Sequence, residues 1–301
     1  MPEAVVVESL VKTYDGINAV DGISFSVGRG EVFALLGPNG AGKTTTIEII
    51  ECIRSLTSGS VSVLGNDVTK MRDVPKIKRR IGVLPQDFSI FENLKVWEVV
   101  DFFASLYGCS GNVSSVLSML DLTKDRNKNF DSLSGGMKQR VGIASAVVHE
   151  PEVVFLDEPT TGLDPKSRRD VWKFIRELKG KGKTVILTTH YMEEAQVLSD
   201  RVGIIADGKI RVIDAPANLI RSYGGLKKVV LELKSGGSKE RIIEEYGATE
   251  SNGKLTVYLK DDQELKRLIA DAEYEDVEVI TPTLEDVFLK IVGFRLKEDG
   301  A

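Results

Sequence analysis

Residues 37–45, GPNGAGKTT, carry the clearest chemistry in the chain. They fit the pattern G-x-x-x-x-G-K-[ST] and lie between the apolar run EVFALL and the helical TTTIEIIE. In this pattern backbone N–H groups converge on phosphates, Lys43 reaches the β- and γ-phosphates, and Thr44 can ligate Mg²⁺. The segment therefore predicts a nucleoside triphosphate site. The residues expected to touch the nucleotide are Gly37, Pro38, Asn39, Gly40, Ala41, Gly42, Lys43, Thr44 and Thr45.

The segment VVFLDEP, residues 153–159, supplies two adjacent carboxylates. Its apolar run places Asp157 at the carboxyl end of a strand, a position suited to holding Mg²⁺. Glu158 is the candidate to orient and polarise the attacking water, because a general base separates a hydrolase from a nucleotide store. A strand ending in Asp-Glu is by itself more often a solvated turn, and the nearby phosphate loop favours the hydrolytic interpretation.

Three further side chains follow or flank predicted strands. His190 ends TVILTTH and is either a γ-phosphate sensor or a helix-capping, solvated histidine. Gln86 ends IGVLPQ and can contact magnesium and water through its amide. Tyr14 can stack on an adenine face, although an aromatic residue near a strand end is more often packing.

The stretch LSGGMKQR, residues 133–140, contains a second serine-glycine-glycine turn that opens a helix. The ordinary interpretation is a helix start, because serine caps helices and glycine bends the chain. A serine hydroxyl, glycine N–H groups and a helix dipole also form an anion site. The local pattern alone favours the helix start, so an anion site needs support from the rest of the chain.

Apolar runs alternate with segments of helical period along most of the chain, which predicts an α/β fold with a mixed, largely parallel sheet. The expected strands contain residues 4–11, 23–27, 32–37, 61–65, 81–85, 153–159, 184–190 and 201–213. Residues from about 90 to 150 lack strand signals and read as an inserted helical subdomain, with helices in 94–108, 114–122 and 136–150.

The pattern restarts after residue 225 and gives a small α+β domain over residues 226–301. Its order of strand, helix, strand, strand, helix, strand is that of a ferredoxin-like domain, and the helical TLEDVFLKIVG closes it. The first domain is accordingly expected to span residues 1–225.

Composition limits the classes of function. The net charge of −5 argues against a broad polyanion-binding surface, so we expect no nucleic-acid partner. The two cysteines, Cys52 and Cys109, lack metal-type spacing and are expected to be free thiols in a reducing compartment. Residues 102–120 are uncharged, but their glycine, asparagine and serine content makes them a poor membrane span.

In chain order these segments resemble the ATP-binding subunits of ABC transporters, over about residues 3 to 225. The matches beyond the phosphate loop and VVFLDEP are Tyr14 to the adenine-stacking aromatic, Gln86 to the Q-loop, LSGGM to the signature, Asp164 within GLDP to the D-loop, and His190 to the switch histidine. One departure is Met137, where the family usually has glutamine. The Ser134-Gly135-Gly136 core that would meet phosphate is intact.

The resemblance implies ATP hydrolysis with ATP and Mg²⁺ as cofactors, and a second ATPase subunit as partner in a homodimer. In this family two subunits pack head-to-tail, so Ser134 would contact the γ-phosphate held by Lys43 of the other subunit. That arrangement accounts for the second anion site of the chain.

A separate integral-membrane permease subunit is also implied, with this chain peripheral on the cytoplasmic face of the cell membrane. Its expected docking surface is residues 86–93, where Phe88, Ile90 and Phe91 either form an apolar patch or belong to the core. The ending TPTLEDVFLKIVG resembles that of ATPases from drug, antibiotic and sodium export systems, so export is expected.

Three classes of function compete at this point: a transport ATPase, a soluble ABC ATPase of translation, repair or chromosome handling, and a regulatory nucleotide-binding module. The second class usually carries two cassettes or a long coiled-coil insertion, which this sequence lacks, and Glu158 disfavours the third. Within transport, import is the alternative to export, because both directions share one kind of nucleotide site.

Overall fold

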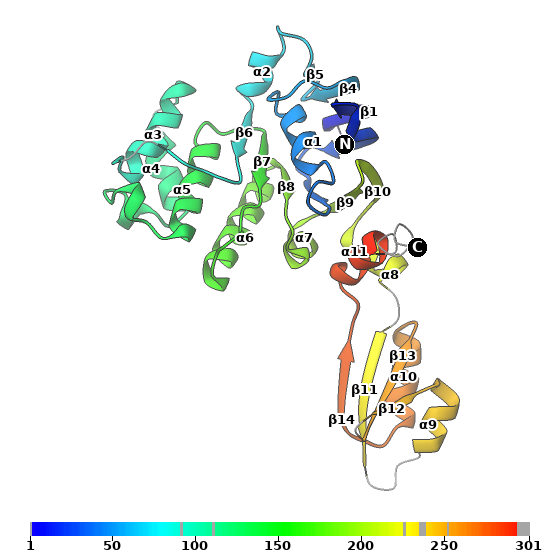
Figure 1. Cartoon of the computed structure of the whole chain (residues 1–301). Helices are drawn as coiled ribbons and strands as arrows, with labels where there is room; N and C mark the ends of the chain where they lie inside the picture. Colours follow the sequence, from blue (N-terminus) through cyan, green and yellow to red (C-terminus); the bar gives the residue numbers. More distant parts are fainter. Residues whose placement is uncertain are drawn as a thin grey trace. The chain divides into compact units, whose positions relative to one another are not determined.

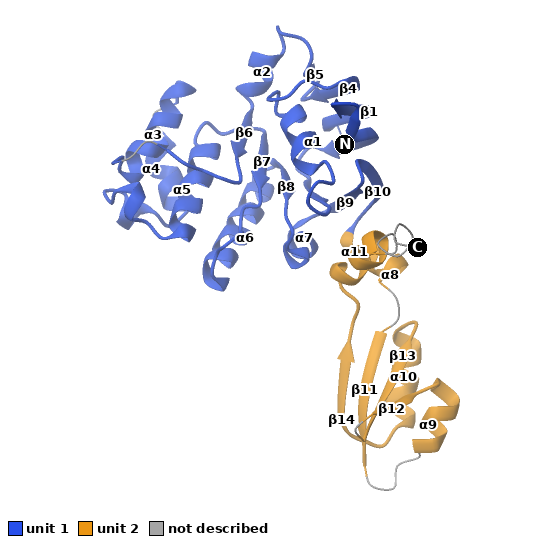
Figure 2. Ribbon diagram, viewed as in Figure 1, with its two compact units in different colours: residues 1–215 blue, residues 216–301 orange. Residues whose placement is uncertain are grey.

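The computed structural model describes residues 2–90, 93–109, 112–224, 227–234, 239–251 and 253–293. The chain divides into two compact units, residues 1–215 and residues 216–301 (Figure 2). The second unit begins before the predicted domain boundary at 225/226, because helix α8 (Pro216–Tyr223) packs against helix α11 (Leu284–Gly293) (Figure 1). The two divisions therefore differ by one helix.

The first unit contains two sheets. A six-stranded sheet has the order β10-β9-β3-β8-β7-β6, in which only the β9–β10 pair is antiparallel. A four-stranded antiparallel sheet has the order β2-β1-β4-β5. The strands are β1 (Glu3–Tyr14), β2 (Ile17–Gly28), β3 (Val32–Leu36), β4 (Ser58–Val63), β5 (Asn66–Asp67), β6 (Ile81–Leu84), β7 (Val153–Asp157), β8 (Thr184–Thr188), β9 (Arg201–Ala206) and β10 (Lys209–Asp214).

Helix α1 (Lys43–Ile50) lies in one hydrophobic core with residues of both sheets. Ile47, Ile49 and Ile50 contribute its apolar side, and Phe25 stacks on Phe33 at a ring-centroid distance of 5.4 Å. Strands β3 and β8 are buried along their whole length, as expected for parallel strands covered on both faces. The first unit is completed by α2 (Val74–Lys78), α6 (Pro165–Gly180) and α7 (Met192–Leu198).

Two Asp-Gly turns refine the predicted strands. Asp15 and Gly16 have φ of 46° and 83°, and Asp207 and Gly208 have φ of 51° and 70°. Positive φ at both central residues is the requirement of a type I′ hairpin turn. The predicted run 201–213 is consequently the hairpin of β9 and β10, and β2 begins at Ile17 directly after the first turn.

The predicted helical region contains α3 (Val96–Leu106), α4 (Val113–Met119) and α5 (Gly135–Val147), with 3₁₀ turns at Thr123–Asp125 and Phe130–Ser132. Helix α3 packs on both α4 and α5 (Figure 1).

The expected docking residue Phe88 belongs to the packing of this region. Its ring lies 6.0 Å from that of Phe103 and 5.9 Å from that of Phe130, between centroids. Phe88 is half-buried, so part of its ring packs within this region and part stays accessible. Ile90 is half-buried, and Phe91 lies outside the described residues.

The second unit has one antiparallel sheet in the order β12-β13-β11-β14. Numbered within the unit, this is the strand order 2-3-1-4, and the chain order of strands and helices is the one predicted for a ferredoxin-like domain. The elements are β11 (Lys227–Leu233), α9 (Lys239–Tyr246), β12 (Thr249–Ser251), β13 (Lys254–Leu259), α10 (Asp262–Asp271) and β14 (Tyr274–Ile280). The predicted fold class is confirmed in both units.

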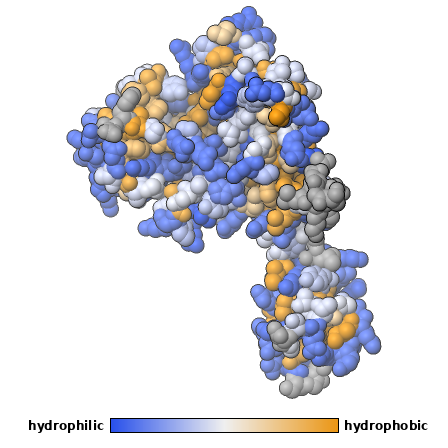
Figure 3. Space-filling model, in the orientation of Figure 1, coloured by the Kyte–Doolittle hydropathy of each residue, from blue (hydrophilic) through white to orange (hydrophobic). Residues whose placement is uncertain are grey.

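Hydrophilic residues cover most of the visible face, and hydrophobic residues appear there in small groups (Figure 3). Among the described helices, none has the length and apolar character needed to cross a membrane. Cys52 and Cys109 are both free thiols and half-buried.

Candidate nucleotide-binding site

The predicted phosphate loop joins β3 to α1. Gly40 and Gly42 have φ of 80° and 101°, and a Cβ atom on Gly42 would lie 2.4 Å from the carbonyl oxygen of Ala19. Glycine at position 42 is thus required by both conformation and space. Lys43 Nζ donates to the carbonyl oxygens of Gly37 and Pro38, at 2.7 and 3.0 Å. The loop is folded so that its lysine lies across its own backbone.

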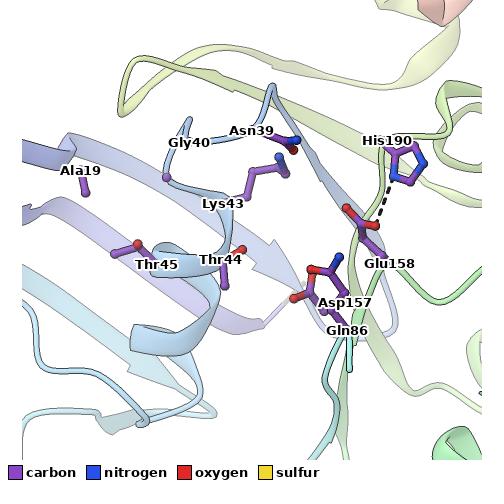
Figure 4. Close-up of a pocket in the computed structure, with 11 residues that line it drawn as sticks. Ala19, Asn39, Gly40, Lys43, Thr44, Thr45, Gln86, Asp157, Glu158 and His190 are labelled. Atoms are coloured by element: carbon purple, nitrogen blue, oxygen red, sulfur yellow. Dashed lines mark ion pairs between the residues drawn. The ribbon is translucent and has the colours of Figure 1, made fainter. Parts of the chain in front are cut away.

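A cavity of about 790 Å³ lies over this loop (Figure 4). Its described lining comprises Ala19, Asn39, Gly40, Gly42, Lys43, Thr44, Thr45, Gln86, Asp157, Glu158 and His190. The predicted residues come from the carboxyl ends of four adjacent parallel strands: the loop after β3, His190 after β8, Asp157 on β7 and Gln86 after β6. Ligand sites of parallel sheets form at this edge.

Burial acts on the charges of the cavity in opposite directions. It lowers the pKa of Lys43, although the carboxylates of Glu158 and Asp157 counteract the shift. Burial raises the pKa of Asp157, against the hydrogen bond that Thr188 Oγ1 donates to its Oδ1. A bound cation next to Asp157 would favour its charged form, so this carboxyl suits a metal ligand better than a free anion.

Glu158 is held in a single orientation by its neighbours. Its φ of 47° lies in the left-handed region, which is uncommon outside glycine and costs conformational energy. Its N–H donates to the carbonyl oxygen of Thr188 at 3.0 Å, and Thr161 Oγ1 donates to Glu158 Oε2 at 2.9 Å. His190 Nδ1 lies 3.2 Å from the same Oε2 (Figure 4). A strained, multiply held carboxylate at a cavity wall is typical of a functional site.

Eight of the predicted site residues do not line this cavity in the described structure: Tyr14, Gly37, Pro38, Ala41, Ser134, Gly135, Gly136 and Asp164. Gly37, Pro38 and Ala41 belong to the phosphate loop itself. Tyr14 ends β1 with 39% of its surface exposed, and the cations of Lys12 and Arg54 lie 5.0 and 5.9 Å from its ring centroid. Its ring already has charged partners within the chain.

The signature and D-loop residues begin helices. Ser134 is the N-cap of α5, where its Oγ accepts from the N–H of Met137 at 3.4 Å. Asp164 is the N-cap of α6 and accepts from the N–H groups of Lys166 and Ser167 at 2.9 and 3.0 Å. Hydrogen bonds from the Ser167 side chain and backbone lower the pKa of Asp164. Both residues are exposed.

Two residues near the cavity escaped the sequence analysis. Ala19 lines it from β2, and its backbone sets the space available to Gly42. Glu51 is the C-cap of α1, with 6% of its surface exposed. Burial, together with the negative charges of Asp157 and Glu48, raises the pKa of Glu51 to about 8. The sequence did contain one sign that Glu51 is buried, because its carboxyl stands within the apolar run IIEC. No local pattern indicated that Ala19 lines the cavity.

Comparisons with known proteins agree with this geometry. The family described as "ABC transporter" matches residues 20–161. The linearmycin resistance ATP-binding protein LnrL of Bacillus subtilis (strain 168) is 34% identical over 97% of this chain and 99% of that protein. Nod factor export ATP-binding protein I of Paraburkholderia xenovorans (strain LB400) is 36% identical over 99% of this chain and 100% of that protein.

One similar solved structure is a dimeric ATP-binding cassette in a post-hydrolysis state, bound to ADP and Pi. It is 27% identical, with a TM-score of 0.65, and the match covers 70% of this chain and 98% of that chain. The similarity thus includes most of one complete cassette.

Proposed function

Because the chain belongs to the ATP-binding subunits of ABC transporters, we propose that it hydrolyses ATP to drive export through a separate membrane permease. The observation that carries the proposal is the gathering of Lys43, Gln86, Asp157, Glu158 and His190 in one cavity at the carboxyl edge of the parallel sheet. Drug resistance and export in the names of full-length relatives support the outward direction over import. The chain would work peripherally, on the cytoplasmic face of the membrane where ATP is available.

Mg²⁺ fits the donors that the cavity offers. Thr44, Gln86 and Asp157 contribute a hydroxyl, an amide oxygen and one carboxylate, which leaves positions for phosphate oxygens and water. When bound, Mg²⁺ neutralises charge on the β- and γ-phosphates. Lys43 provides a positively charged side chain beside the phosphates. Its Nζ can replace its hydrogen bonds to the carbonyl oxygens of Gly37 and Pro38 with hydrogen bonds to phosphate oxygens.

Glu158 is proposed as the general base and His190 as the residue that senses the γ-phosphate. Thr161 and His190 both contact Glu158 Oε2, so the carboxylate is oriented before water arrives. We propose that Ser134, Gly135, Gly136 and Asp164 complete the site of a second copy in a head-to-tail homodimer. The similar dimeric cassette supports this assembly.

Glu158→Gln tests the central assignment. The amide is nearly isosteric but cannot accept the proton of water, so hydrolysis should fall by about 10²- to 10⁴-fold. ATP binding should persist, and the variant should accumulate as an ATP-bound dimer. Phosphate release and solution mass with and without Mg-ATP provide the measurements, with Glu193→Gln, exposed on α7, as the control. Wild-type turnover in Glu158→Gln would remove Glu158 from the base role.

A further inference from the structure

The two glycines of the signature meet different surroundings. A Cβ atom on Gly135 would meet no atom of the described residues within 4 Å. A Cβ atom on Gly136 would lie 2.8 Å from Ser167 Oγ and 3.0 Å from Ser167 Cβ. Neither glycine has positive φ, so backbone conformation does not explain either one. Position 136 therefore needs glycine because of a contact within the chain, and position 135 does not.

Ser167 cannot easily move away from position 136. Its Oγ donates to Asp164 Oδ2 at 2.6 Å, while its N–H donates to Oδ1 of the same carboxylate at 3.0 Å. Rotating the hydroxyl away from a methyl group at 136 would break the bond to Asp164. The Ser167 Cβ would remain in place, because it lies in the first turn of α6.

Leu163 extends the same contact, since its Cδ2 would lie 3.7 Å from the Cβ of residue 136. Helices α5 and α6 are in contact with each other. The N-terminus of the signature helix is thus seated on the D-loop helix of its own chain. The packing of Gly136 against Ser167 therefore determines the distance between Ser134 and Asp164.

We propose that Ser167 is a positioning residue, which sets the height of the signature helix above the D-loop so that Ser134 and Asp164 meet a second subunit as one rigid surface. This inference rests on the proposed head-to-tail dimer. Gly136 is glycine to admit Ser167, whereas Gly135 is glycine to admit a group from outside its own chain. Sequence resemblance treats the two glycines alike, and the packing separates their roles.

Paired substitutions test the inference. In Gly136→Ala the added methyl must displace α5, so kcat should fall by about 10- to 100-fold, as misplacement of about 1 Å can produce. Removing the obstacle in Gly136→Ala/Ser167→Gly should restore kcat to within about threefold of Ser167→Gly alone. Ser167→Ala removes only the hydroxyl and should rescue less. The matched control is Gly135→Ala, with and without Ser167→Gly, and it should show no rescue.

Two further readouts separate positioning from general damage. The lysine side of the cavity is untouched, so Gly136→Ala should bind a fluorescent ATP analogue with wild-type affinity while kcat falls. Gly136→Ala should form less ATP-dependent dimer than wild type, and Gly136→Ala/Ser167→Gly should form it again. Overlapping melting curves without nucleotide confirm that each variant is folded.

Wild-type turnover in Gly136→Ala, or an equal response of both alanine variants to Ser167→Gly, would overturn the inference. If wild-type protein hydrolyses ATP without any ATP-dependent dimer, the head-to-tail proposal fails instead. The rescue pattern at position 136 would still report the contact with Ser167.

Discussion

Glu51→Gln should make the protein more stable at neutral and alkaline pH. Glu51 has 6% of its surface exposed, and burial raises the pKa of its carboxyl to about 8 from 4.5. The unfolded chain ionises this group near pH 4.5, whereas the folded chain holds its proton until pH 8. The folded state therefore binds more protons than the unfolded state between these pH values. As a result, the free energy of unfolding of the wild-type protein decreases as pH rises through this range. Glutamine has a similar shape and no charge to bury.

The size of the effect follows from the two pKa values. One pKa unit corresponds to about 1.4 kcal/mol. Ionisation of Glu51 in the unfolded state costs the folded protein about 1 kcal/mol at pH 5 and about 4 kcal/mol at pH 8, relative to a neutral side chain. The advantage of Glu51→Gln over wild type should thus grow by about 3 kcal/mol across this interval. That is a large share of the stability of an ordinary domain.

Denaturant unfolding at pH 5, 6.5 and 8 measures this difference, followed by the fluorescence of Trp97 and Trp172, both of which lie in the first unit. Glu3→Gln is the control, because Glu3 is exposed in the same unit. Its unfolding free energy should stay parallel to wild type over the whole range. Parallel curves for Glu51→Gln as well would show that Glu51 is not a buried, protonated carboxyl, and would refute the reasoning.

Two other predictions concern the phosphate loop and the signature. Lys43→Ala should barely change the melting temperature without nucleotide. The increase in melting temperature caused by Mg-ATP should become smaller, because a ligand that binds the folded state more weakly stabilises it less. An unchanged ATP-induced shift with unchanged turnover would contradict the assignment. A heterodimer of Lys43→Ala with Ser134→Ala places both defects in one site, so vanadate-trapped nucleotide should clearly exceed that of either homodimer. Background trapping in all three, with wild type positive, would reject the action of Ser134 across the dimer.

The main elements of the fold were predictable because local patterns and the tertiary structure agree. Buried parallel strands read as apolar runs, such as VFALL in β3 and TVILT in β8. The spacing G-x-x-x-x-G-K-[ST] places a phosphate loop after β3 whatever surrounds it. Once the strands are known to be parallel, their carboxyl ends gather Gln86, Asp157 and His190 without further assumptions.

What the sequence left open depends on contacts between distant segments. The sequence did not decide whether Phe88 forms an apolar patch or packs inside, and the structure places its ring against those of Phe103 and Phe130. Ser167 reads as an ordinary residue in the first turn of a helix, and only the approach of Gly136 gives it a role. Such roles are set by tertiary packing, to which local propensity is blind.

The charges of the cavity give a physical reason why hydrolysis should wait for a second subunit. The described lining contains one lysine and two carboxylates, Lys43 against Asp157 and Glu158. ATP adds several negative charges to a site where burial already opposes the ionised forms of Lys43 and Asp157. Mg²⁺ would offset part of this charge, and in the proposed head-to-tail dimer the N-terminus of the partner's signature helix would offset more at the γ-phosphate. In the proposed dimer a single subunit would bind ATP, while the developing charge of the transition state would be fully stabilised only after two subunits close on it.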